Sequence, residues 1–308
     1  MKNKQAIKVI IGVVLLIVAL IVWSRLWGIN KPPSEIDYPA ISTAETYSDL
    51  EIMFIDVGQA DSILVSCHNE YMLVDGGNVG DSDVVYTVLH KKNVSELKYV
   101  LLSHDHEDHV GGLPAAFIDT KVGAVYANTD SASTKCFQNF MKRVNGAGLK
   151  VIVPKEDVEL MLGDARVQIL VPTAEFMKTN EYKKNPNNQS LVVKITHGSN
   201  TILLTGDCEL EEENDLLHKY ENTNTLKDID LLKVGHHGSD TATSVHWLET
   251  VLPKYAVISC GEGNKYGHPH QVTLDKLKQA EVNVYRTDLL GDIYFRSDGK
   301  ELWYVAQE

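Results

Sequence analysis

Cysteine is scarce in this chain of 308 residues, which holds four, at positions 67, 136, 208 and 260. None forms a C-x-x-C pair, which argues against a zinc knuckle or a thioredoxin-type site. Cys208 and Cys260 follow apolar runs and are predicted to be buried thiols. Nothing in the spacing argues for a disulfide.

The chain also lacks an excess of positive charge. It has 42 acidic against 29 basic residues, a formal net charge of −13. This balance gives no general attraction for polyanions and argues against tight nonspecific binding of nucleic acid. A local basic groove stays open as an alternative, because bound metal ions add positive charge where they lie. Internal repeats and low-complexity segments are not evident.

A long uncharged run, Val9 to Ser24, follows three lysines near the N-terminus. Sixteen helical residues cover about 24 Å, less than the ~30 Å hydrocarbon core of a bilayer. Two tryptophans and a snorkelling arginine at the end of the run extend its usable span. Because the lysines precede the run, we predict an uncleaved single-pass anchor in the cell membrane, with the rest of the chain extracellular. A cleaved signal peptide is the alternative.

Three segments are expected: an anchor at 1–28, a flexible tether at 29–49 and a globular domain at 50–308. The tether is rich in Pro, Ser, Thr and acidic residues. In the domain, many predicted strands form two clusters with helices between them, which predicts an α/β fold of two facing sheets with helices outside. An acidic helix is expected at Glu209 to Tyr220, with its acidic face in solvent.

The most specific signal is the segment SHDHEDH, Ser103–His109, directly after a predicted buried strand. Imidazole and carboxylate are ligands that Zn²⁺, Mn²⁺ and Fe accept. His104 and His106 can converge on one ion, and Asp108 and His109 can serve a second ion a few Å away. The alternative is a charged loop formed by chance, which the specificity of the pattern argues against.

Potential ligands follow other predicted strands as well. Each has a plain alternative when taken singly: a turn or N-cap residue for the aspartate, a polar loop for the histidines. Together with the first motif they indicate one metal site at strand ends, where loops are free to carry chemistry. The residues are Asp207, His236, His237, His268 and His270.

These motifs resemble the metallo-β-lactamase-fold hydrolases, through LLSHDHEDHVGGL and LLTGDC. More narrowly, the chain is similar to the extracellular hydrolase domain of ComEC-type competence proteins. That similarity rests on FIDVGQADSILV, MLVDGG, NNQSLVVKI, TILLTGDCE, LLKVGHHGSDTATS and YAVISCGEGNKYGHPH. It covers about Leu50 to Glu308. It implies a four-layer αββα sandwich with a two-metal centre at one edge of the sheets.

The resemblance also implies ligands for two divalent ions, Zn²⁺ or Mn²⁺. His104 and His106 would bind one ion, Asp108 and His109 the other, and Asp207 would bridge them. His268 would complete the second site. The HHG pair would provide a ligand or a contact to substrate phosphate. The spacing leaves their roles open, and we assign His236 to the ligands and His237, with Asp108, to catalysis.

Further roles follow from the same resemblance. Asp75 would steady the metal loop, and Gln59 and Asp61 would lie near the mouth of the site and contact substrate. Ser239 would donate to a phosphate oxygen, with a helix N-cap as its alternative.

The chain departs from the broad superfamily at one point. The histidine expected ahead of the bridging aspartate is replaced by Asn187-Asn188-Gln189-Ser190, and we expect His197 at the surface. The first ion therefore lacks a ligand. Either a histidine of the HHG pair fills the gap, or the centre holds one ion tightly.

The expected function is a membrane-anchored, metal-dependent phosphodiesterase. It would act on DNA or another phosphodiester through a metal-bridged hydroxide. One alternative is a carboxylic ester or lactone hydrolase, and another is a non-catalytic tethered binding module. No protein partner is indicated.

Overall fold

The structure, a computed structural model, describes residues 49–306. The predicted anchor at 1–28 lies outside the described residues, as does almost all of the predicted tether. Among residues 49–306, each helix is too short or too polar to cross a bilayer.

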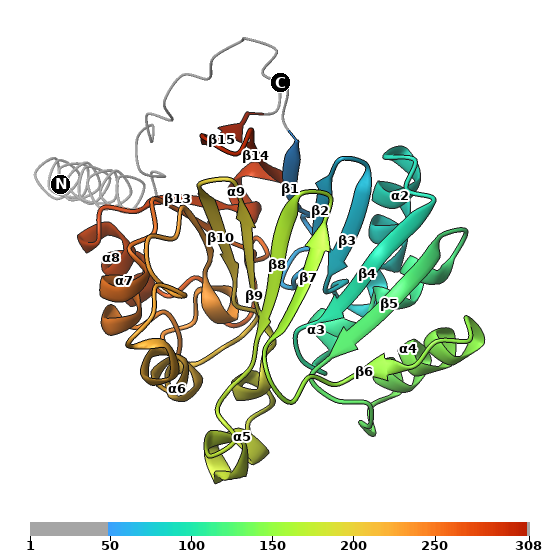
Figure 1. Ribbon diagram of the computed structural model, residues 1–308, viewed down its shortest axis with the longest axis horizontal. Coiled ribbons are helices and arrows are strands. Elements are labelled where there is room, and N and C mark those ends of the chain that lie inside the picture. The colour runs from blue at the N-terminus through green and yellow to red at the C-terminus, as the bar shows by residue number, and fades with distance from the viewer. Residues whose placement is uncertain (1–48, 307–308) are drawn as a thin grey trace, which may run out of the picture. The chain divides into compact units, whose positions relative to one another are not determined.

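Two sheets form the centre of the domain (Figure 1). The eight-stranded sheet has the order β15-β14-β1-β2-β3-β4-β5-β6, and the seven-stranded sheet has the order β13-β12-β11-β10-β9-β8-β7. Strands β3 to β6 are parallel to one another, and so are β10 to β13, while the remaining pairs are antiparallel.

The strands of the eight-stranded sheet are β1 (Leu50–Phe54), β2 (Ile63–Cys67), β3 (Glu70–Val74), β4 (Glu96–Leu102), β5 (Lys121–Ala127), β6 (Val151–Ile152), β14 (Ile293–Ser297) and β15 (Leu302–Val305). Those of the seven-stranded sheet are β7 (Val158–Leu162), β8 (Ala165–Leu170), β9 (Val192–His197), β10 (Asn200–Leu204), β11 (Leu231–Lys233), β12 (Tyr255–Ile258) and β13 (Asn283–Arg286).

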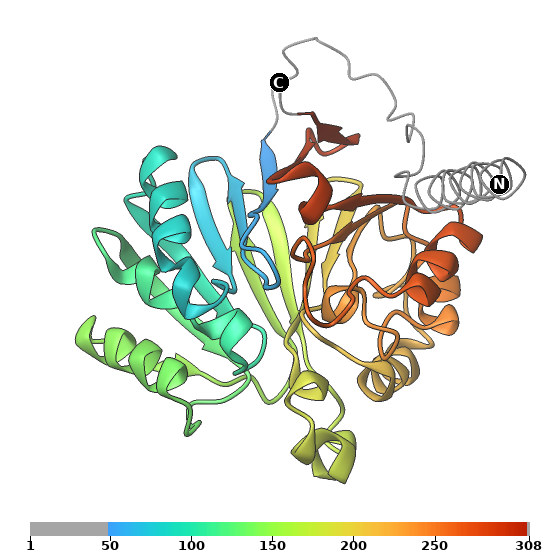
Figure 2. The same ribbon diagram turned by 180° about the vertical axis from the view of Figure 1, so that it is seen from behind.

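Helices flank the two sheets on their outer sides (Figures 1 and 2). The eight-stranded sheet carries α2 (Ser82–Lys91), α3 (Glu107–Val110) and α4 (Lys135–Gly146). The seven-stranded sheet carries α6 (Leu210–Tyr220), α7 (Val245–Val251) and α8 (Gln271–Gln279). The short helices are α5 (Asn180–Lys184) and α9 (Thr287–Leu290), with 3₁₀ turns η1 (Val79–Asp81), η2 (Leu113–Phe117), η3 (Phe176–Lys178), η4 (Pro186–Gln189) and η5 (Gly235–Gly238).

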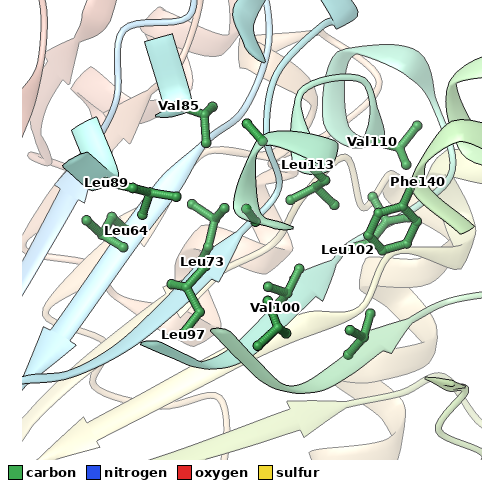
Figure 3. Packing of buried hydrophobic residues seen from close by; sticks show 14 of the residues in the cluster. Leu64, Leu73, Val85, Leu89, Leu97, Val100, Leu102, Val110, Leu113 and Phe140 are labelled. Atoms are coloured by element: carbon green, nitrogen blue, oxygen red, sulfur yellow. The ribbon is translucent and has the colours of Figure 1, made fainter. Parts of the chain in front are cut away.

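Burial on both faces of each sheet explains the layers. Leu73 and Val100 pack with Val85 of α2 and Phe140 of α4 (Figure 3). Their strand neighbour Leu101 is buried too, and because side chains alternate along a strand it faces the other sheet. The other sheet buries its outer face in the same way, against α6, α7 and α8. The predicted two-sheet sandwich with outer helices is confirmed.

The prediction of a solvated acidic face on α6 is wrong. Glu212 and Glu213 are buried, at 0% and 2% exposure. Glu213 accepts hydrogen bonds from the backbone N–H groups of Thr243 (2.5 Å) and Ser244 (3.0 Å), just ahead of α7. The first N–H groups of a helix have no partner within it and favour a negative charge nearby. The run of acidic residues on α6 therefore includes two buried side chains, of which Glu213 binds the backbone ahead of α7.

His197 is also not at the surface, as had been expected. It ends β9 and is 2% exposed. Its Nδ1 lies 2.8 Å from Oγ of Ser297 on β14, which belongs to the other sheet. The neighbouring Gly198-Ser199 turn suggested exposure, but packing of one sheet on the other buries the imidazole.

Candidate metal centre

The metal loop after β4 is fastened to the turn after β3 by close backbone contact. The N–H of Gly76 donates to the carbonyl of His109 (2.8 Å), and that of Gly112 donates to the carbonyl of Gly77 (3.0 Å). A Cβ on Gly112 would lie only 1.9 Å from the Gly76 carbonyl oxygen. Only glycine allows two backbones to approach this closely. The glycine pair of MLVDGG (Gly76 and Gly77) and that of HVGGL (Gly111 and Gly112) thus pack against each other.

Asp75 holds this loop from beneath. It is 1% exposed, and its carboxylate accepts from the backbone N–H and the hydroxyl of Ser103, both at 2.7 Å. Its Oδ2 also lies 2.8 Å from Nδ1 of His109. A carboxylate on Nδ1 fixes the ring so that Nε2 points away from it, which is the usual support of a metal-binding histidine. The placement suits the supporting role expected for Asp75.

Four side chains from both sheets converge, with Asp207 among them. Nε2 of His109 lies 3.4 Å from Asp207 Oδ2, and Nε2 of His237 lies 3.6 Å from Asp207 Oδ1 and 3.4 Å from Asp108 Oδ2. Each of the four has a ligand atom within 4.8 Å of the others. Asp108 and His109 follow β4, whereas Asp207 follows β10 and His237 follows β11.

A second set of imidazoles lies beside the same carboxylate. Nε2 of His104 and Nε2 of His236 each lie 3.8 Å from Asp207 Oδ2. Nδ1 of His106 lies 3.0 Å from the His104 nitrogen. Asp207 is therefore the one carboxylate shared by both sets, as expected for a bridging ligand.

Charge and burial in this cluster fit bound cations. Nε2 of His109, Nε2 of His237 and Oδ1 of Asp207 are buried without a hydrogen-bond partner. Such groups are costly unless something satisfies them, and imidazole and carboxylate are ligands for Zn²⁺, Mn²⁺ or Fe. Against the effect of burial, the imidazoles of His237 and His109 hold the pKa of Asp207 well below its usual range. The carboxylate therefore stays ionised in the interior.

The HHG pair divides between two environments, and the placement of His237 does not suit the catalytic role predicted for it. His237 is 1% exposed, and its Nδ1 lies 2.9 Å from the carbonyl oxygen of Ser259, so Nε2 is turned into the cluster. The side chain of His236 is 24% exposed, with Nδ1 2.9 Å from Oε1 of Glu209. Both residues have left-handed backbone conformations, with φ of 53° and 48°, which cluster at functional sites. His237 lies where a ligand belongs, rather than where a proton donor would meet solvent.

His268 lies outside the group around Asp207. Its Nδ1 is 3.2 Å from Nε2 of Gln59, whose Oε1 accepts from the N–H of Gly261 (3.2 Å). The Gln59 amide therefore donates to Nδ1, and the ring proton of His268 resides on Nε2. A protonated Nε2 has no lone pair for a metal, so the predicted ligand role does not fit. Burial and then the nearby imidazoles of His236 and His237 lower the pKa of His268 to about 4.

Two predicted substrate contacts are also wrong. Asp61 is 1% exposed and lies behind the ligands, with Oδ1 3.6 Å from Nδ1 of His237. Ser239 is 3% exposed and bonds to the Thr241 hydroxyl (3.0 Å). It is not a helix N-cap either, because Ser244 caps α7. Both side chains are buried and do not face solvent.

Lys233 was missed by the sequence analysis. It is 0% exposed, and its ammonium lies 2.5 Å from Asp61 Oδ2 and 3.8 Å from Asp207 Oδ1. It also donates to the carbonyl of Gly206 (2.9 Å), just before Asp207. A lysine is almost never fully buried unless paired. The signal was present as the one charge in the apolar strand LLKV before the HHG turn.

Glu209 and Asn187 were missed as well. The Glu209 carboxylate accepts from the Asn187 amide (3.1 Å) and the Thr241 hydroxyl (2.8 Å) as well as facing His236. Although burial opposes it, hydrogen bonds from His236, Thr241 and Asn187 lower the pKa of Glu209 to about 2. Asn187 thus stands beside His236, where the superfamily histidine was expected, and helps to place that ring.

Residues 55–262 match the metallo-beta-lactamase superfamily, and the chain belongs to it. This fold binds divalent metal ions, usually two.

Its relatives include ComEC-type competence proteins, as the sequence motifs predicted. The ComE operon protein 3 of Bacillus subtilis (strain 168) is 29% identical over 84% of this chain and 34% of that protein. The competence protein ComA of Neisseria gonorrhoeae is 27% identical over 88% of this chain and 35% of that protein. The chain spans about a third of the length of these relatives. Among solved structures, the diiron beta-hydroxylase CmlA from Streptomyces venezuelae shares the fold, with a TM-score of 0.53 at 14% identity over 82% of this chain and 55% of CmlA.

Proposed function

We propose that this protein is a metal-dependent phosphodiesterase that acts on DNA or another phosphodiester. The observation that carries the proposal is the Asp207 carboxylate, which two sets of imidazoles share; the first set includes the unpaired buried nitrogens of His109 and His237. Asn187 in place of the upstream histidine counts against a carboxylic ester or lactone.

Two groups of residues would hold the ions. Asp108, His109 and His237 would bind one ion with Asp207, and His104, His106 and His236 would bind the other. His236 then fills the place left by the absent upstream histidine. When bound, the two ions supply a water of lowered pKa and positive charge beside the phosphorus.

The exposed side chains of the centre support one direction of approach for a substrate. The side chains of Asp108 and His236 are 29% and 24% exposed, whereas His104, His109 and His237 are buried. A phosphodiester would therefore approach past Asp108 and His236, and the buried rings would exclude bulk water from the far side.

His268 would act on the substrate rather than on an ion. The ring of His268 lies 5.5 Å from the ring of the partly exposed His236. The hydrogen bond from Gln59 keeps the proton of the His268 ring on Nε2. That N–H would donate to a phosphate oxygen and stabilise the charge that develops there.

The test combines metal analysis with a screen over substrate classes. The protein should retain Zn²⁺ or Mn²⁺ and cleave single-stranded DNA or bis-p-nitrophenyl phosphate, and His106→Ala and Asp207→Ala should abolish this. Turnover of a lactone alone would refute the proposal in favour of ester chemistry. A protein that refuses both metals would refute every enzymatic function and leave a tethered binding module.

We further propose that the domain is held at the cell surface by the apolar segment at 1–28. The basis is the lysine-flanked run, because positive charge stays on the cytoplasmic side. Protease added to intact cells should then cut the segment at 29–49 and release the domain. Protection until the cells are lysed would reverse the orientation.

A further inference from the structure

Three turns meet at the edge of the sandwich opposite the metal loop. These are the β2–β3, β7–β8 and β9–β10 turns, at the upper edge in Figure 1, whereas α3 lies at the lower edge. Cys67 and His68 lie at the first turn, Asp164 at the second and His197 at the third. None of them belongs to the centre around Asp207.

The four side chains gather around one carboxylate oxygen. Oδ1 of Asp164 lies 3.0 Å from Cys67 Sγ, 3.4 Å from His197 Nε2 and 3.2 Å from His68 Nε2. Ligand atoms of Cys67, Asp164 and His197 lie within 4.8 Å of one another. Tetrahedral zinc bonds of about 2.0–2.3 Å place neighbouring ligand atoms roughly 3.3–3.8 Å apart. Cys67, Asp164 and His197 therefore need only small shifts to surround an ion, and His68 lies against the same carboxylate oxygen.

The hydrogen bonds behind His197 turn its lone pair into this cluster. Ser297 Oγ donates to Oδ1 of Asn200 (2.7 Å), which uses its only proton. The hydroxyl must then accept from Nδ1–H of His197 at 2.8 Å. Nε2 of a neutral His197 therefore carries no proton and faces the Asp164 carboxylate. Two electron-rich atoms at 3.4 Å repel each other unless a proton or a cation lies between them.

The cluster combines fixed and adjustable members. Cys67 and His197 are 0% and 2% exposed, whereas the side chains of His68 and Asp164 are 47% and 59% exposed. A Cβ on Gly163 would lie 2.8 Å from Cys67 Sγ, so glycine is what lets the β7–β8 turn approach the sulfur. Two rigid ligands and two that can turn from the solvent side form a site that an ion can enter.

We propose that Cys67, His68, Asp164 and His197 form a second metal site, which binds Zn²⁺ and joins the two sheets. Thiolate, imidazole and carboxylate are zinc ligands, and four of them close the coordination shell as in structural sites. Cys67 belongs to the eight-stranded sheet, and Asp164 and His197 to the seven-stranded one. The ion would thus join the two sheets at the edge of the sandwich opposite the proposed catalytic metals.

Cobalt substitution tests the site, because a cobalt–thiolate bond absorbs in the near ultraviolet and the proposed catalytic ligands include no thiol. The full-length protein, stripped by a chelator and refilled with Co²⁺, should bind a third equivalent and show this absorption. Cys67→Ser should abolish the band and remove one equivalent. Cys136→Ser is the matched control, since this buried thiol in α4 pairs only with the Thr134 hydroxyl. This variant should keep the absorption band and the third equivalent of Co²⁺.

Two outcomes would overturn the proposal. One is wild-type protein with Co²⁺ bound but no thiolate band, which would mean that the cluster is held by a proton between His197 and Asp164. The other is a band that survives Cys67→Ser. Should that variant fail to fold, Asp164→Asn removes a charge from an exposed side chain instead. It should weaken the third Co²⁺ at least 10-fold, and unchanged affinity would contradict the site.

Discussion

Lys233 supports the centre from its buried side, through charge and through one hydrogen bond to the carbonyl of Gly206. Its ammonium lies between Asp61 and Asp207, and within residues 49–306 the other ion-pair partners of these two carboxylates are imidazoles. Removing one partner of a buried pair leaves the other charge uncompensated, at a cost of about 3–5 kcal/mol. Replacing both partners is far less costly.

Lys233→Met should therefore lower the free energy of unfolding by about 3–5 kcal/mol, measured in urea without added metal. Asp61→Asn in the same chain should restore part of the loss. Lys194→Met is the control, because this buried lysine on β9 donates only to the Thr225 carbonyl, and it should cost about 1 kcal/mol. Equal losses of stability in Lys233→Met and Lys194→Met would contradict the charge argument.

His268→Ala separates a substrate contact from a metal ligand. If His268 donates to phosphate, kcat should fall about 10²–10³-fold while the number of bound ions stays the same. Gln59→Leu should give a smaller loss of the same kind, because it frees the ring without removing it. Loss of one equivalent of metal from His268→Ala would instead show that His268 is a metal ligand.

Local spacing decided which site residues could be predicted. His104, His106, Asp108 and His109 lie within six positions, so the sequence alone indicates their common purpose. Lys233 and Glu209 act through partners distant in the chain, and only the packing of two sheets brings these together. Asp61 was misplaced for the same reason: its motif lies next to the site, but its side chain turns inward.

At the scale of elements, α6 departs most from its sequence pattern. Burial, then the nearby acidic groups Asp215 and Glu213, raise the pKa of Glu212 well above 4.5. The folded protein therefore keeps this proton to a higher pH than the unfolded chain does. Protonation of Glu212 therefore favours the folded state. Its contribution to the free energy of unfolding is complete below about pH 4.5 and is lost as pH rises toward the raised pKa.

Glu212→Gln should remove the loss of stability that wild type shows as pH rises, because the amide stays neutral. The variant should be more stable than wild type at pH 7–8, and the difference should shrink toward pH 4, with a slope of at most about 1.4 kcal/mol per pH unit. Urea unfolding across this range measures it. Glu249→Gln on the exposed face of α7 is the control and should show no such trend. A parallel shift at every pH would contradict the prediction.

Most elements could be predicted within a few residues, because each buried strand or helix face has its own period. The helix expected at Val272–Ala280, for example, is α8 at Gln271–Gln279. The segment with η3, α5 and η4 was missed, since its turns are short and polar and carry no apolar period. Its hydrogen bonds to α6, such as Asn187 to Glu209, exist only in the folded chain.

For the whole molecule, the metal centre is a joint between two sheets. The loop after β4 belongs to one sheet, and the loops after β10 and β11 belong to the other. Ions that bind only the folded state stabilise it by mass action, about 2.7 kcal/mol at 100 times the Kd. Chelation should therefore lower the Tm by about 5–10 °C.

Differential scanning calorimetry with and without a chelator measures this shift, and added Zn²⁺ or Mn²⁺ should reverse it. Asp207→Ala should lose most of the response, and Cys67→Ser only the part due to the second site. Loss of metal by analysis without any change in Tm would show that the ions do not join the sheets.

Lys233 has one more consequence, which is a matter of counting. Asp61, Asp75, Asp108, Asp207 and Glu209 provide five carboxylates around the centre, against the one ammonium of Lys233. With neutral imidazoles the net charge is −4, so one divalent ion leaves −2 and two leave 0. A phosphodiester carries a single negative charge, and the second ion therefore removes the repulsion. The KM for bis-p-nitrophenyl phosphate should fall as that ion binds, and a KM indifferent to it would contradict the count.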